Sequence, residues 1–176
     1  GSFRNLLVGL RIRQLVARAE DPIGMRSNLI KLKPVWANRF AAPTVAELRS
    51  GLVPEAAPVF DTARKALGDL PGVVESLKWM GVPWSWTLVY GPAGENQGWA
   101  YLVPEPGRLQ IAVSLPAERL SEIAVKKLPR FVRDGLLQTQ VVGRACWPTW
   151  VVQGATQVDE VVRLVASVRT GVEVGV

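Results

Sequence analysis

The spacing of apolar residues predicts two helices in the segment that follows residue 42. Apolar side chains that recur every three or four residues return to one face of a helix, and this spacing occurs in residues 44–52 and 53–70. Glu47 follows Thr44 by three residues, which is the pattern of a capping box. We therefore expect the first of these helices to begin at Thr44.

Apolar and polar residues alternate from Val73 onward, which is typical of strands with one buried face. Segments rich in glycine and proline separate the alternating runs and predict turns between them. The strands are expected at residues 73–80, 84–90, 99–103 and 108–115. Within the second strand, Trp84, Trp86, Leu88 and Tyr90 are two residues apart. The pattern predicts that they share one face of an antiparallel meander.

Helical spacing returns after Leu115 and predicts three further helices and a last strand. The helices are expected at residues 116–128, 129–140 and 156–171, and the strand at 146–153. Pro148 predicts that this strand lies at an edge of the sheet or begins there, because proline cannot donate to a strand ladder. Thr156 is expected to cap the last helix. This order favours an α+β fold, with an antiparallel sheet of about four to five strands and helices packed on one face.

The first 42 residues differ from the rest of the chain in charge. They hold eight basic and two acidic residues, so their net charge is +6, whereas residues 43–176 sum to zero. Gly1 and Ser2 are typical of a remnant of tag cleavage, and the spacing in residues 3–19 predicts a helix. We therefore expect a basic N-terminal helical arm, residues 1–42, and a single α+β domain, residues 43–176.

The arm has three interpretations. It could contact nucleic acid or anionic lipid, it could pack on its own domain, or it could pack on a second copy and form a homo-oligomer. The arginines that would make the first kind of contact are Arg4, Arg11, Arg13 and Arg18. The leucine and valine content of the arm favours packing over nucleic-acid binding. No run of about 18 apolar residues occurs, so no membrane span is expected.

The sequence offers little for catalysis. The chain has no histidine, which excludes the Ser-His-Asp and Cys-His nucleophiles and the usual zinc sites. Cys146 is the single cysteine; it has no partner for an internal disulfide, and we expect it to be buried in a cytoplasmic protein. Neither glycine-rich phosphate-binding motif occurs. We therefore expect no catalytic residue, no metal and no cofactor.

Four of the seven tryptophans lie between residues 79 and 99. Two hypotheses account for this concentration: the rings form the core beneath the helices, or they form the wall of a groove for a flat or apolar ligand. Glu75, Arg108 or Ser85 would orient a ligand in that groove. The candidate ligand-binding residues are Trp84, Trp86, Tyr90, Trp99, Tyr101, Arg108 and Glu75.

Spaced tryptophans and prolines between about residues 43 and 170 form a recognisable pattern. The residues that carry it are Pro43, Thr44, Glu47, Leu48, Gly81, Trp84, Trp86, Trp99, Tyr101 and Pro104, with the segments 109–115 and 147–152 and the helix from Val158. This pattern resembles the DUF3788 family, a bacterial domain of unknown function. The resemblance implies a small α+β domain whose sheet cups a hydrophobic groove, and it implies no activity.

Two functions from different classes follow from these observations. The first is binding or sensing of a small apolar or aromatic ligand in a tryptophan-lined groove of a bacterial protein. The alternative is a regulatory or interaction module whose basic arm contacts nucleic acid or a partner protein. Enzyme activity is third, because no residue pattern points to a reaction.

Overall fold

The computed structural model describes residues 35–95, 97–139 and 141–170. The chain divides into two units, Gly1–Leu32 and Lys33–Val176, and all described residues belong to the second. The predicted helical arm lies outside the described residues as far as residue 34, and so do Arg4, Arg11, Arg13 and Arg18. The unit that contains the sheet begins at Lys33, whereas the sequence predicted a domain that begins at Pro43.

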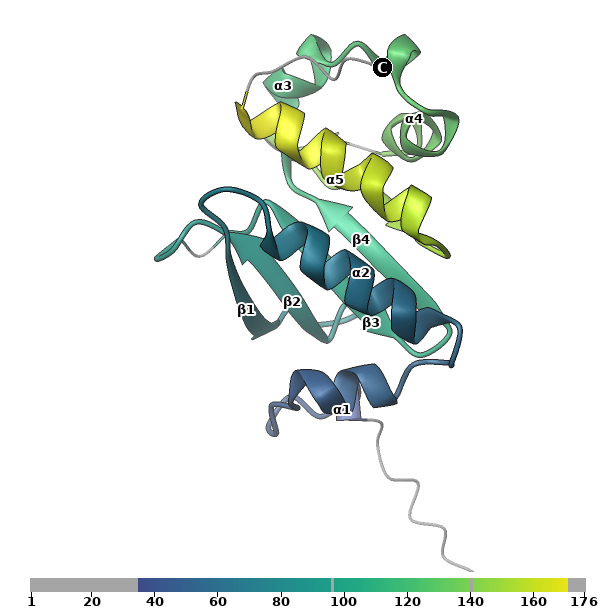
Figure 1. Ribbon diagram of the computed structural model, residues 1–176. Coiled ribbons are helices and arrows are strands. Elements are labelled where there is room, and N and C mark those ends of the chain that lie inside the picture. The colour runs from purple at the N-terminus through teal and green to yellow at the C-terminus, as the bar shows by residue number, and fades with distance from the viewer. Residues whose placement is uncertain (1–34, 96, 140, 171–176) are drawn as a thin grey trace, which may run out of the picture. The chain divides into compact units, whose positions relative to one another are not determined.

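A five-stranded antiparallel sheet in the order β1-β2-β3-β4-β8 forms the centre of this unit. Figure 1 shows its first four strands. Its strands are β1 (Val74–Trp79), β2 (Trp86–Gly91), β3 (Ala100–Glu105), β4 (Arg108–Val113) and β8 (Thr149–Val151). The first four strands form the predicted meander. The edge strand β8 begins directly after Pro148, which confirms the expectation for that proline.

A second sheet of three two-residue strands has the order β5-β7-β6. These strands are β5 (Leu115–Pro116), β7 (Ala145–Cys146) and β6 (Val141–Val142). The sequence did not predict this sheet, because two residues are too few to establish an alternating pattern.

Within the described residues, the α-helices agree in number and order with those predicted after residue 42 and differ at some ends. They are α1 (Val45–Ser50), α2 (Ala56–Gly68), α3 (Ala117–Glu122), α4 (Arg130–Leu137) and α5 (Ala155–Thr170), with short 3-10 helices η1 (Val35–Ala37) and η2 (Val125–Lys127). The segment 116–128, predicted as one helix, is divided into α3 and η2.

Two helix starts test the capping predictions. The capping box is confirmed: the Thr44 hydroxyl accepts from the Glu47 amide at 3.2 Å, and Glu47 Oε2 accepts from the Thr44 amide at 2.7 Å. The cap predicted for the last helix is wrong, because α5 already includes Thr156. At that start the Gln157 side chain accepts from the Gln153 amide at 2.7 Å.

The main core lies between the sheet and helices α2, α4 and α5, as Figure 1 shows for α2 and α5. Leu88, Leu102 and Ile111 are register partners on neighbouring strands and are fully buried. From the helices, Phe60 and Leu164 pack into the same cluster. Each such side chain contributes about 1.5–3 kcal/mol by leaving water. The predicted fold class, with helices on one face of an antiparallel sheet, is confirmed.

The other face of the sheet carries a smaller cluster. Val89, Tyr101 and Ala112 are buried on that face, and the partly buried rings of Trp84 and Trp147 pack against them. Trp99 and Trp150 belong to the main core instead. The tryptophans are therefore distributed over both faces of the sheet.

Candidate functional site

Trp84 does not share a face with Trp86, Leu88 and Tyr90, so that prediction is wrong. Strand β2 begins at Trp86, and Ser85 just before it has a φ of 52°, which only a small fraction of residues other than glycine adopt. The Trp84 ring lies 5.5 Å from the Tyr101 ring, on the face opposite Leu88 and Tyr90. The alternation rule assumes a regular strand, and the turn at Ser85 breaks that regularity.

Glu75 and Tyr90 belong to the core side of the sheet, where they contact each other. They are register partners on β1 and β2. Tyr90 is fully buried, and its hydroxyl donates to Glu75 Oε2 at 2.9 Å. Arg64 of α2 donates to the same carboxylate through Nε and Nη2, each at 2.8 Å. Burial, with the neighbouring Glu75 carboxylate, raises the pKa of Tyr90 above its ordinary value, so this hydroxyl remains a donor.

Removing the Glu75 carboxylate would leave the buried Tyr90 hydroxyl without its acceptor. We expect Glu75→Ala to lower the free energy of unfolding in urea by about 1–3 kcal/mol, the penalty of an unsatisfied buried polar group. Adding Tyr90→Phe to Glu75→Ala should recover part of this loss, since the unsatisfied hydroxyl is then gone. If the double variant loses as much free energy of unfolding as the Glu75→Ala and Tyr90→Phe variants together, the two side chains do not interact, and this account is contradicted.

Trp99 and Tyr101 lie toward the start of β3, away from Trp86. Trp99 packs at the margin of the main core, and the guanidinium of Arg169 lies 5.0 Å from the centre of its ring. The Tyr101 side chain is buried on the other face, where its hydroxyl accepts from the Gly98 amide at 2.8 Å. The structure therefore separates the predicted aromatic residues into several environments.

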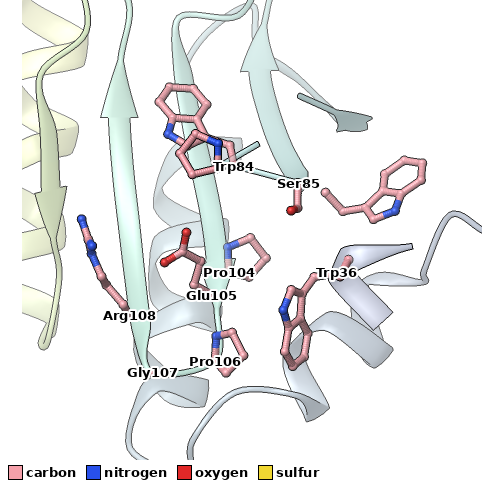
Figure 2. A pocket seen from close by; sticks show the side chains of 11 residues that line it. Trp36, Trp84, Ser85, Pro104, Glu105, Pro106, Gly107 and Arg108 are labelled. Atoms are coloured by element: carbon pink, nitrogen blue, oxygen red, sulfur yellow. The ribbon is translucent and has the colours of Figure 1, made fainter. Parts of the chain in front are cut away.

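Trp84, Trp86 and Arg108 do meet in one pocket, at the end of the sheet where β3 turns into β4 (Figure 2). Its volume is about 340 Å³. The residues that line it are Trp36, Ala37, Pro83, Trp84, Ser85, Trp86, Pro104, Glu105, Pro106, Gly107 and Arg108. Three tryptophans and three prolines make most of this lining apolar and flat.

Trp36 is a pocket residue that the sequence did not indicate. It lies in η1, and in Figure 2 it stands across from Pro104 and Pro106. A Cβ on Gly51 would lie 2.5 Å from Trp36 Cζ3, so the ring rests directly on this glycine. The Asn38 carbonyl, just after η1, accepts from Trp86 Nε1 at 2.8 Å. No local pattern could have placed Trp36 here, because all of these contacts are distant in sequence.

The polar side of the pocket is a short chain of hydrogen bonds. Arg108 Nη2 donates to Gln110 Oε1 at 3.2 Å, and Gln110 Nε2 donates to Glu105 Oε2 at 3.3 Å. Arg108 is exposed and forms no salt bridge within the described part of the chain. The Val53 amide donates to the Pro106 carbonyl at 3.2 Å, which ties the β3–β4 turn to the segment after α1.

The structure also bears on the cysteine, the membrane span and the metal site that the sequence analysis considered. Cys146 is buried, as expected, and burial raises the pKa of its thiol. Among residues 35–95, 97–139 and 141–170, no helix has the length and apolar character needed to cross a membrane. The same residues contain no group of three or more potential His, Cys, Asp or Glu metal ligands.

Comparisons with protein-family models, with curated proteins and with solved structures found no match. The resemblance to the DUF3788 family therefore stays a prediction.

Proposed function

We propose that this protein binds a small apolar or aromatic ligand in the pocket between η1 and the β3–β4 turn. The observation that carries the proposal is the convergence of Trp36, Trp84 and Trp86 on one pocket of about 340 Å³. Pockets for small ligands begin at about 300 Å³ and combine an apolar lining with a few polar groups. The cytoplasmic location expected from the sequence is part of this proposal.

Two of the three rings are partly exposed, which supports a binding role over a purely structural one, whereas Trp86 is 8% exposed. Trp36 and Trp84 are only partly buried, whereas Trp150 in the main core is 3% exposed. A flat ligand between Trp36 and the rings of Pro104 and Pro106 would remove apolar surface on both sides from water. That transfer is favourable by about 25 cal/mol for each Å² that is buried.

The polar side of the pocket favours a ligand with an acidic group. Arg108 stands at the rim, and its guanidinium can bind a carboxylate through two parallel hydrogen bonds. The Glu105 carboxylate would repel such a group, and its hydrogen bond from the neutral Gln110 amide leaves that charge in place, so the acidic group of the ligand has to lie nearer to Arg108 than to Glu105. The ligand class that fits best is therefore a flat apolar body with a carboxylate.

The test uses two probes with the same naphthalene ring, 2-naphthoate and neutral 2-naphthol. Each is expected to raise the melting temperature, because a ligand that binds only the folded state stabilises it. Trp36→Ala should weaken the binding of both probes. Their Kd should rise by about tenfold or more, and tenfold corresponds to about 1.4 kcal/mol. Arg108→Gln should weaken the binding of 2-naphthoate only, by about two- to fivefold in Kd, as expected for an exposed ion pair.

Phe40→Ala is the matched control, since Phe40 is a nearby aromatic residue that is 85% exposed and does not line the pocket. It should bind both probes like the parent protein. The proposal fails if neither probe shifts the melting temperature, or if Trp36→Ala binds both with unchanged affinity.

A further inference from the structure

A second pocket lies at the other end of strand β3, beyond its first residues. Its volume is about 330 Å³, and it is lined by Glu95, by residues 97–99, and by residues of the β4–β5 junction, the β6–β7 turn and the end of α5. The lining differs in character from that of the first pocket. Its polar and charged members are Glu95, Gln97, Ser114, Arg144 and Arg169.

Arg169 is a half-buried cation in this pocket. Its guanidinium lies over the Trp99 ring and donates one hydrogen bond, from Nη2 to the Ser114 carbonyl at 2.8 Å. No carboxylate within the described residues forms a salt bridge with it. Burial lowers the pKa of Arg169 below its ordinary value, which reflects the cost of removing this charge from water. A bound anion would offset that cost.

Ser114 supplies a buried hydroxyl beside this cation. The residue is 4% exposed. Its Oγ accepts a hydrogen bond from Gln97 Nε2 at 2.8 Å, and no acceptor for its own hydrogen is found in the described ranges of the chain. Gln97 thus leaves the Ser114 hydroxyl free to donate to a ligand in the pocket.

We propose that this pocket binds an oxyanion, the phosphate or carboxylate group of a small ligand, through Arg169, Arg144 and the Ser114 hydroxyl. The planar guanidinium groups of two arginines match the geometry of such oxygens. Two positive charges exceed the single negative charge of Glu95 on the rim. The site is independent of the tryptophan-lined pocket, which lies at the opposite end of β3.

The test measures melting temperatures in inorganic phosphate, in acetate, and in sodium chloride at matched ionic strength. Phosphate also stabilises proteins in general, through exclusion from their surface, so the decisive comparison is between variants. The parent protein should gain a saturable increase with phosphate or acetate beyond that with chloride. Arg169→Gln should weaken this binding by about tenfold or more, and Arg144→Gln, at an exposed position, by about two- to fivefold. Arg163→Gln, at an exposed position of the same helix, should retain it.

Arg169→Lys separates charge from geometry, because lysine keeps the charge but lacks the planar fork. It should bind more weakly than the parent protein and more tightly than Arg169→Gln. If Arg169→Gln does not fold, the exposed Arg144 decides the question through Arg144→Gln alone. Equal increases in chloride and in both oxyanions, or an oxyanion effect that every variant keeps unchanged, would overturn the proposal.

Discussion

Replacing Trp150 by alanine is expected to lower the free energy of unfolding by about 3–5 kcal/mol, as for other large buried aromatic side chains. Trp150 is 3% exposed and lies opposite Ile111 at the edge of the sheet. Its Nε1 donates to the Val132 carbonyl of α4 at 3.2 Å. The ring therefore joins the sheet to the helical layer, and its removal leaves a cavity and breaks the hydrogen bond to α4.

Unfolding in urea with a two-state fit measures this loss. Trp36→Ala is the comparison, since Trp36 lies in a three-residue 3-10 helix and belongs to neither buried cluster. It should lose clearly less stability than Trp150→Ala. Equal losses from the two variants would contradict the assignment of Trp150 to the core and Trp36 to the pocket.

Gly135→Ala is expected to lower the free energy of unfolding by about 1–3 kcal/mol, the usual cost of overpacking. Gly135 lies in α4, where alanine alone would be favoured over glycine by about 1 kcal/mol. A Cβ at this position would lie 2.6 Å from Cδ1 and Cε2 of Trp150. The ring would have to move and would weaken its hydrogen bond to Val132, so the steric effect outweighs the helix propensity.

Gly68→Ala provides the matched control for this prediction. Gly68 ends α2, and a Cβ there would have no heavy atom within 4 Å. This variant should be as stable as the parent protein or slightly more stable. A Gly135→Ala variant that is also as stable as the parent protein in urea would show that Trp150 does not pack against α4 as described.

Local patterns predicted most of this fold, because its main elements are regular. The capping box at Thr44 and the four strands of the meander depend on residues close in sequence, and both are present. The expected single buried face is not, because β2, β3 and β4 are buried along almost their whole length, on both faces. The division of residues 116–128 into α3 and η2 was missed. There the chain becomes extended at Ile123, with a ψ of 123°, although the apolar spacing continues.

The site was less predictable than the fold, because long-range contacts decide it. Trp36 enters the pocket through packing on Gly51 and through the bond between Asn38 and Trp86, which no local pattern encodes. Glu75 looked like a candidate ligand contact, but Arg64 on α2 engages its carboxylate. The position of Arg64 relative to β1 follows only from the packed fold.

The indole N–H signals in a proton–nitrogen NMR spectrum test the proposed function most directly. The chain has seven tryptophans, and single Trp→Phe variants assign their signals. Titration with neutral 2-naphthol is predicted to shift the signals of Trp36, Trp84 and Trp86, and to leave those of Trp99 and Trp150 in place. Saturating 2-naphthol that shifts no indole signal, or that shifts only those of Trp99 and Trp150, would contradict binding in this pocket.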